Sequence, residues 1–125
     1  MTVVYDAGVL IAADRNDRAT WADHRVRLES GMIPMTTAPV VAQASRSARQ
    51  VPLQRFLSGC QVVEFTADDA HNVGALLAAS GTSDVVDGHV VSVAVSLTAT
   101  VLTSAPGDIG RLMDATPNPV PVVSI

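Results

Sequence analysis

Short apolar runs alternate with longer stretches of helical spacing along the whole chain. The runs are β-branched or end at turn residues, and they predict five strands, at residues 2–5, 33–37, 61–65, 100–104 and 120–125. The segments between them place apolar residues at helical intervals and carry capping or stop signals. This alternation predicts a single α/β domain over residues 1–125, a three-layer sandwich with a mainly parallel central sheet of about five strands.

The segment from Gly81 to Leu97 is the most ambiguous of these elements. On residue propensity alone, the run 90–97 is compatible with a strand because it is rich in valine. The length of the segment, its polar start and the alternating order of elements favour a helix with Ser83 as its N-cap.

Composition supports this architecture and limits the functions open to it. Hydrophobic residues make up 48% of the 125 residues, but aromatic residues only 3%, which suits buried parallel strands covered by helices. The net charge of −4 gives no overall basic footprint for nucleic acid. A local basic edge remains possible, and Arg46 and Arg49 are candidates for RNA backbone contacts or, equally, for a solvated helix face.

Cellular context is indicated by two simple features. Cys60 is the single cysteine, so an internal disulfide is excluded and a reducing compartment is the default. The N-terminus lacks a basic segment followed by a long apolar run, and no apolar stretch has membrane length. The sequence therefore predicts a soluble cytoplasmic protein that does not contact a membrane.

Carboxylates provide the candidate chemistry. Asp84 and Asp87 stand three residues apart at the start of an apolar helix, with no basic residue nearby in sequence. Either a divalent cation compensates this repulsion, or both acids complement the positive end of the helix. Asp6 follows the first strand, where it can serve a ligand site, cap the next helix, or do both.

The predicted topology brings these acids together. Asp6, the helix start at Asp84 and Asp87, and the loop after residues 100–104 fall on the same edge of a parallel sheet. Converging acids without lysine raise each other's pKa unless a cation is bound, which is typical of a Mg²⁺ or Mn²⁺ site. Such a cation activates water and stabilises charge on a phosphate oxygen, as phosphodiester hydrolysis requires.

Four segments, taken in order and spacing, resemble the PIN-domain family. They are Val3 to Gly8, Val40 to Gln43, Thr82 to Val90 and Ala99 to Ser104, and together they extend the resemblance over nearly the whole chain. Within that family the chain looks most like the VapC-type toxins of bacterial toxin-antitoxin pairs.

The resemblance implies a Mg²⁺- or Mn²⁺-dependent endoribonuclease that cleaves structured RNA of the transfer or ribosomal class. It also implies a cognate antitoxin that inhibits the enzyme, and a homodimer. On matching positions Asp6 and Asp87 are the metal-directed acids, Asp84 is a supporting acid, and Asp108 is an additional acid after the fourth strand. Gln43 and Ser104 stand at supporting positions.

Two departures from the family pattern lead to an alternative function. Gln43 aligns with the family's second acid, and Ala105 with the acid expected directly after Thr-Ser at the end of the fourth strand. Loss of two charges weakens divalent affinity, so the alternative is an inactive PIN-like module that mainly binds its antitoxin or RNA. A receiver-like regulatory domain is a weaker alternative, because the chain has no lysine for the phosphoryl oxygens.

Overall fold

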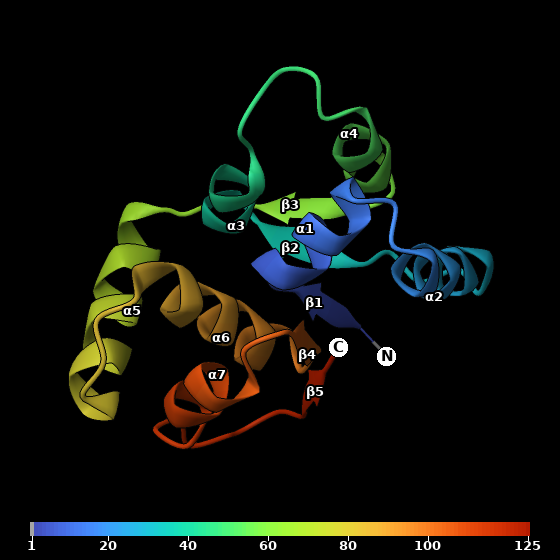
Figure 1. The fold of residues 1–125 in the computed structure, drawn as a ribbon. Helices are drawn as coiled ribbons and strands as arrows, with labels where there is room; N and C mark the ends of the chain where they lie inside the picture. The colour runs from blue at the N-terminus through green and yellow to red at the C-terminus, as the bar shows by residue number, and fades with distance from the viewer. Residues whose placement is uncertain (1) are drawn as a thin grey trace.

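The computed structural model describes residues 2–125, and it has the predicted alternation of strands and helices (Figure 1). The strands are β1 (Val3–Tyr5), β2 (Met35–Thr37), β3 (Gln61–Val63), β4 (Thr100–Thr103) and β5 (Val122–Ser124). The helices are α1 (Ala7–Asp14), α2 (Arg18–Glu29), α3 (Ala38–Ala44), α4 (Val51–Ser58), α5 (Ala67–Ser80), α6 (Val85–Leu97) and α7 (Pro106–Met113). Each strand is shorter than its apolar run, because the flanking residues turn into caps and loops.

The strands form one sheet in the order β3-β2-β1-β4-β5, and every pairing in it is parallel. The predicted fold class is therefore confirmed. Strand β1 lies at the centre, with Val4 opposite Met35 on one side and Val101 on the other. This central position places the residue after β1 at the carboxyl end of the sheet, between the ends of β2 and β4.

Helices cover both faces of the sheet. Helix α6 packs against β1, β2 and β4 and is flanked by α5 and α7, whereas α1 packs on β1 and β4 together with α4 (Figure 1). The core between these layers includes the fully buried side chains of Val4, Leu10, Val90 and Val101. Burial on both faces explains why the strands are continuous apolar runs without alternation.

Residues 90–97 are helical, which resolves the ambiguity of that segment. Valines occur on all sides of α6 because this helix lies between the sheet and two other helices. One boundary differs from the prediction, because helix α6 is capped by Asp84 rather than Ser83. Helix α7 begins at Pro106, since proline suits the first helical turn.

A buried cluster of His24, Tyr5 and Phe56, which the sequence did not predict, joins α2 to the sheet and to α4. The Nδ1 atom of His24 lies 2.9 Å from the hydroxyl of Tyr5, and the imidazole stacks on Phe56 with ring centroids 3.9 Å apart. Burial lowers the pKa of His24. This histidine is therefore a structural residue. Over residues 2–125, no helix has both the length and the apolar character that crossing a bilayer requires.

Candidate active site

Asp6 occupies the junction between β1 and α1, and its carboxylate is fixed from two directions. One oxygen, Oδ1, accepts a hydrogen bond of 2.8 Å from the backbone N–H of Ala7, so Asp6 caps α1. The other, Oδ2, accepts a hydrogen bond of 2.7 Å from Thr103 Oγ1 at the end of β4. Only 5% of Asp6 is exposed. The cap and the site position predicted for Asp6 therefore coincide, and each oxygen keeps a free lone pair.

Asp84 and Asp87 take different roles at the start of α6. Oδ1 of Asp84 accepts a hydrogen bond of 3.0 Å from the backbone N–H of Asp87, which makes Asp84 the N-cap. The carboxylate of Asp87 accepts no hydrogen bond from the part of the chain that the structure describes. The backbone of the next residue, Gly88, lies so close to α5 that a Cβ atom there would be 2.9 Å from Val73 Cγ1. This glycine lets the acidic end of α6 approach the neighbouring helix.

Four acids interact electrostatically at this edge of the sheet. The pKa of Asp87 is raised to about 6, first by burial and then by the charges of Asp6, Asp84 and Asp108. These residues come from the end of β1, the start of α6 and the start of α7. The topology brings the three segments to one edge of the sheet, as the sequence predicts.

A hollow of about 370 Å³ opens at this edge, between α6 and α7. Three of the acids, Asp84, Asp87 and Asp108, line it together with the polar residues Thr82 and Ser83. Arg111 is the one basic residue among its lining residues. The hollow is thus acidic, open to solvent and bordered by a single cation.

The residues present fit a divalent cation that keeps much of its water. The carboxylate of Asp87 has no hydrogen-bond partner among the described residues, and its pKa is raised first by burial and then by the negative charge of Asp6. Within residues 2–125, no three histidine, cysteine or acidic side chains gather as a complete metal-ligand group. Mg²⁺ is commonly held by one or two carboxylates, waters and the phosphates of a substrate. Asp6 and Asp87 match the carboxylates of such an open site in residue type, and residues 2–125 form no closed protein cage for a metal.

Ala105 precedes α7 at the same edge of the sheet and adds no charge or metal ligand there. It is the N-cap of α7, where it provides no side-chain hydrogen bond, and its backbone N–H donates to Thr103 Oγ1 over 2.9 Å. Since the same hydroxyl bonds Asp6, the backbone of Ala105 is linked to the Asp6 carboxylate through Thr103.

The remaining predicted residues lie outside the acidic hollow. Gln43 lines a second hollow with Asp14 and Arg46, and Ser104 lies against Gly8 and lines a third between α1 and β5. The guanidinium of Arg46 donates to the carbonyl oxygens of Ala42 and Ser45, at 3.3 and 2.8 Å. Arg49 is exposed. The structure therefore places Asp84, Asp87 and Asp108 together at the hollow, with Asp6 near enough for its charge to act on Asp87. Outside this hollow lie Gln43, Ser104, Arg46 and Arg49.

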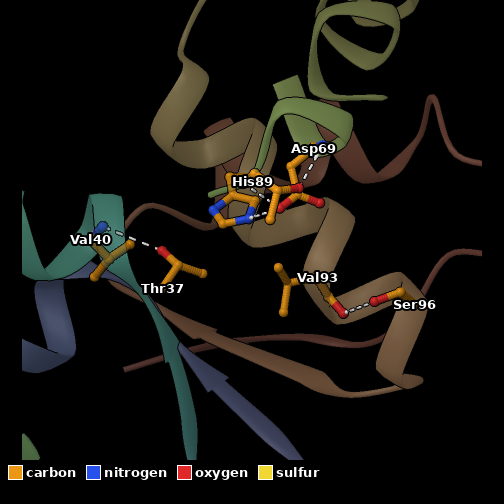
Figure 2. A network of polar contacts seen from close by, with 7 residues as sticks. Thr37, Val40, Asp69, His89, Val93 and Ser96 are labelled. Carbon is orange, nitrogen blue, oxygen red and sulfur yellow. Dashed lines mark hydrogen bonds and ion pairs between the residues drawn. The ribbon is translucent and has the colours of Figure 1, made fainter. Parts of the chain in front are cut away.

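A buried histidine two residues beyond Asp87 has no counterpart in the sequence analysis. His89 is fully buried, and Nε2 lies 3.6 Å from Asp69 Oδ2, too far for a hydrogen bond (Figure 2). Neither ring nitrogen has a hydrogen-bond partner among the described residues. Burial lowers the pKa of His89 despite the nearby carboxylate, and the ring packs edge-on against Phe65.

Thr103 and Arg111 are site residues that sequence reasoning missed. Thr103 resembles any β-branched residue in a buried strand, and its bond to Asp6 joins positions 97 residues apart. Arg111 follows Asp108 by three residues on α7, a spacing that could have placed both on one face.

Comparison with known proteins supports the fold but gives no sequence relative. No protein-family model matches the chain, and no curated protein matches it. Among solved structures, the chain is similar to VapBC2 from Rickettsia felis bound to a DNA fragment from its promoter, with a TM-score of 0.72, 18% identity and coverage of 100% of this chain and 99% of that one.

Two further structures agree. FitAcB from Neisseria gonorrhoeae matches with a TM-score of 0.62 and 15% identity, covering 96% of this chain and 95% of that one. PAE2754 from Pyrobaculum aerophilum matches with a TM-score of 0.61 and 18% identity, covering 97% and 92%. At these identities the likeness concerns the fold, and the chain has the PIN-like α/β fold of VapC-type proteins that its motifs led us to expect.

Proposed function

We propose that this chain is the toxin of a toxin-antitoxin pair and cleaves structured RNA with the help of Mg²⁺ or Mn²⁺. The observation that carries the proposal is the hollow lined by Asp84, Asp87 and Asp108, where burial and the charges of Asp6, Asp84 and Asp108 also raise the pKa of Asp87. Proteins that share one fold can have unrelated activities, so we infer the function from the residues of this site and not from the fold alone.

Each acid has a distinct task in the proposed reaction. Asp6 and Asp87 hold the cation, and the hydrogen bond from Thr103 keeps the Asp6 carboxylate in one orientation. When bound, the cation supplies an activated water and stabilises negative charge on the scissile phosphate. Asp84 and Asp108 add negative potential at the hollow that attracts the cation.

The proposed partners follow from the same considerations. The fold is shared with VapBC2, a structure bound to promoter DNA, and this likeness supports a cognate antitoxin as the partner. We also propose transfer or ribosomal RNA as the substrate class, a homodimer as the working assembly, and the cytoplasm as the location. Arg46 is exposed, but its guanidinium donates hydrogen bonds to the end of α3, so we assign it no contact with RNA.

Cleavage of bacterial total RNA by the purified chain tests the proposal. We expect fragments of defined length in Mn²⁺ or Mg²⁺, none in EDTA, and none with Asp6→Asn, which removes the charge but keeps the shape. Asp114→Asn is the matched control, because Asp114 is an exposed acid at the far end of α7. Equal cleavage by Asp6→Asn and the parent chain would overturn the assignment.

One observation favours a second function. Ala105 is linked to Asp6 through the Thr103 hydroxyl and stands where the family pattern has a further acid, and residues 2–125 hold no three-ligand metal group. An inactive module that binds an antitoxin or RNA would show binding without cleavage in any metal. Restoration of cleavage by Ala105→Asp would then identify the missing carboxylate as the cause.

A further inference from the structure

Arg111 stands at the rim of the acidic hollow. It lies in the last turn of α7, three residues after Asp108, so both side chains project from one face of the helix. Both line the hollow that Asp84 and Asp87 also line. Arg111 is exposed, and α7 lies at the surface of the molecule beside α6 (Figure 1).

The guanidinium of Arg111 is not engaged by the acids around it. Among residues 2–125, no carboxylate lies within 4.0 Å of the Arg111 guanidinium, and the Arg111 side chain forms no hydrogen bond. Two other arginines are engaged, since Arg27 donates to the Tyr5 hydroxyl and Arg46 to the end of α3. Arg111 shares its lack of a side-chain hydrogen bond with the five remaining arginines, but it alone of the eight lines the acidic hollow. Arg111 therefore keeps its hydrogen-bond donors for a ligand, although three carboxylates border the same hollow.

An acidic site that acts on RNA has an electrostatic problem, because its carboxylates repel the phosphate that must enter. Two carboxylates of the chain leave charge and coordination positions of the cation to be completed by the substrate. A planar guanidinium offers paired donors that match two non-bridging oxygens of a phosphate. Placed at the rim, such a group lowers the repulsion and orients the phosphate toward Asp6 and Asp87.

We propose that Arg111 binds the phosphate backbone of the RNA substrate at the entrance of the acidic hollow. The inference rests on the proposed ribonuclease function and adds a residue that determines substrate affinity. The alternative is a purely structural role, in which Arg111 complements the negative end of α7. That role affects stability but not the affinity for RNA.

Fluorescence anisotropy with a labelled transfer RNA separates these roles. The titration is performed in Ca²⁺, which takes oxygen ligands, with a gel to verify that the RNA stays intact, and it is repeated at several salt concentrations. The variants are Arg111→Ala, Arg111→Lys and the matched control Arg25→Ala. Arg25 is exposed on α2, away from α7 (Figure 1).

We expect Arg111→Ala to weaken RNA binding about tenfold and to lower the slope of log Kd against log salt by about one. Arg111→Lys should keep the slope because it keeps the charge, but should bind more weakly than the parent because it lacks paired donors. Arg25→Ala should match the parent. Thermal unfolding of each variant checks that the fold is intact.

Two results would overturn the inference, and they are distinguishable. If the parent chain binds RNA and Arg111→Ala binds with the same affinity and salt slope, Arg111 does not contact the phosphate, while the proposed function stands. If the parent chain does not bind RNA at all, the proposed function fails and the role of Arg111 fails with it.

Discussion

Thr103 Oγ1 donates a hydrogen bond of 2.7 Å to Asp6 Oδ2, linking residues that are 97 positions apart in the chain. The same hydroxyl oxygen accepts a hydrogen bond of 2.9 Å from the backbone N–H of Ala105. One fully buried hydroxyl thus connects the end of β1, the end of β4 and the start of α7. It orients the acid that the proposed site requires.

Replacement of this hydroxyl should destabilise the protein. Thr103→Val keeps the shape of the side chain but leaves the buried Asp6 Oδ2 and the N–H of Ala105 without their partner. We expect the free energy of unfolding in urea to fall by about 1–3 kcal/mol. Thr103→Ser keeps the hydroxyl and should lose less. Equal losses for the two variants would show that the methyl group, and not the hydrogen bonds, stabilises the fold.

Asp87 should destabilise the metal-free protein at neutral pH. The pKa of Asp87 is about 6 in the folded state and 3.8 as its ordinary value, so the folded state binds the proton more tightly. Its ionisation therefore lowers stability as pH rises from about 4 through 6. The full shift corresponds to about 3 kcal/mol, and solvent screening of this half-buried group reduces the effect to about 1 kcal/mol.

Asp87→Asn in EDTA tests this relationship. We expect the variant to unfold with a free energy about 1 kcal/mol above the parent at pH 7, and with a much smaller difference at pH 4. Asp114→Asn, the exposed control, should show no such pH-dependent gain. A variant less stable than the parent at pH 7 would contradict the electrostatic picture of the site.

Gly8 is required by the close contact of α1 with the end of β4. A Cβ atom added at Gly8 would lie only 2.7 Å from the Cβ atom of Ser104 and would overlap that side chain. Gly8→Ala should therefore cost about 1–3 kcal/mol of stability.

Gly74 lies inside α5 with nothing within 4 Å of its added Cβ, so Gly74→Ala should raise stability by up to about 1 kcal/mol.

The double variant Gly8→Ala with Ser104→Gly separates overlap from other causes. Removal of the Ser104 side chain should restore part of the lost melting temperature. If the double variant is no more stable than Gly8→Ala alone, the contact with Ser104 is not the cause.

His89 should make the fold sensitive to acid. Burial lowers its pKa, so the unfolded chain binds a proton more readily than the folded one, and stability is lost as pH falls through about 6.5. His89→Leu removes the titrating ring and its unpartnered nitrogens. We expect its free energy of unfolding to exceed that of the parent by about 1 kcal/mol at pH 5, with a smaller difference at pH 8. If His89→Leu were less stable than the parent, and by more at pH 5 than at pH 8, this role of His89 would be contradicted.

The sequence was sufficient for the features that depend on local pattern. The apolar runs and caps predicted alternating strands and helices around a mainly parallel sheet, and the placement of Asp6 and Asp87 at one edge of the sheet followed from that order. A strand end followed by a helix is a local signal, and the geometry of parallel sheets converts it into a position in space.

The features that were missed depend on contacts between distant segments. The bond from Thr103 to Asp6, the pairing of His24 with Tyr5 and the burial of His89 each require two elements to pack in one particular way. The choice of Asp84 over Ser83 as the cap was missed for another reason, since both residue types cap helices equally well.

Binding of Mn²⁺ at pH 7, measured by calorimetry on the parent chain and on Ala105→Asp, tests the proposed site most directly. Asp87 is mostly ionised at this pH and can act as a ligand. We expect the parent to bind one ion weakly and Ala105→Asp to bind it more tightly, because a third carboxylate would stand beside Asp6. Binding by Ala105→Asp with none by the parent would contradict a working metal site in this chain and would leave partner binding as its function.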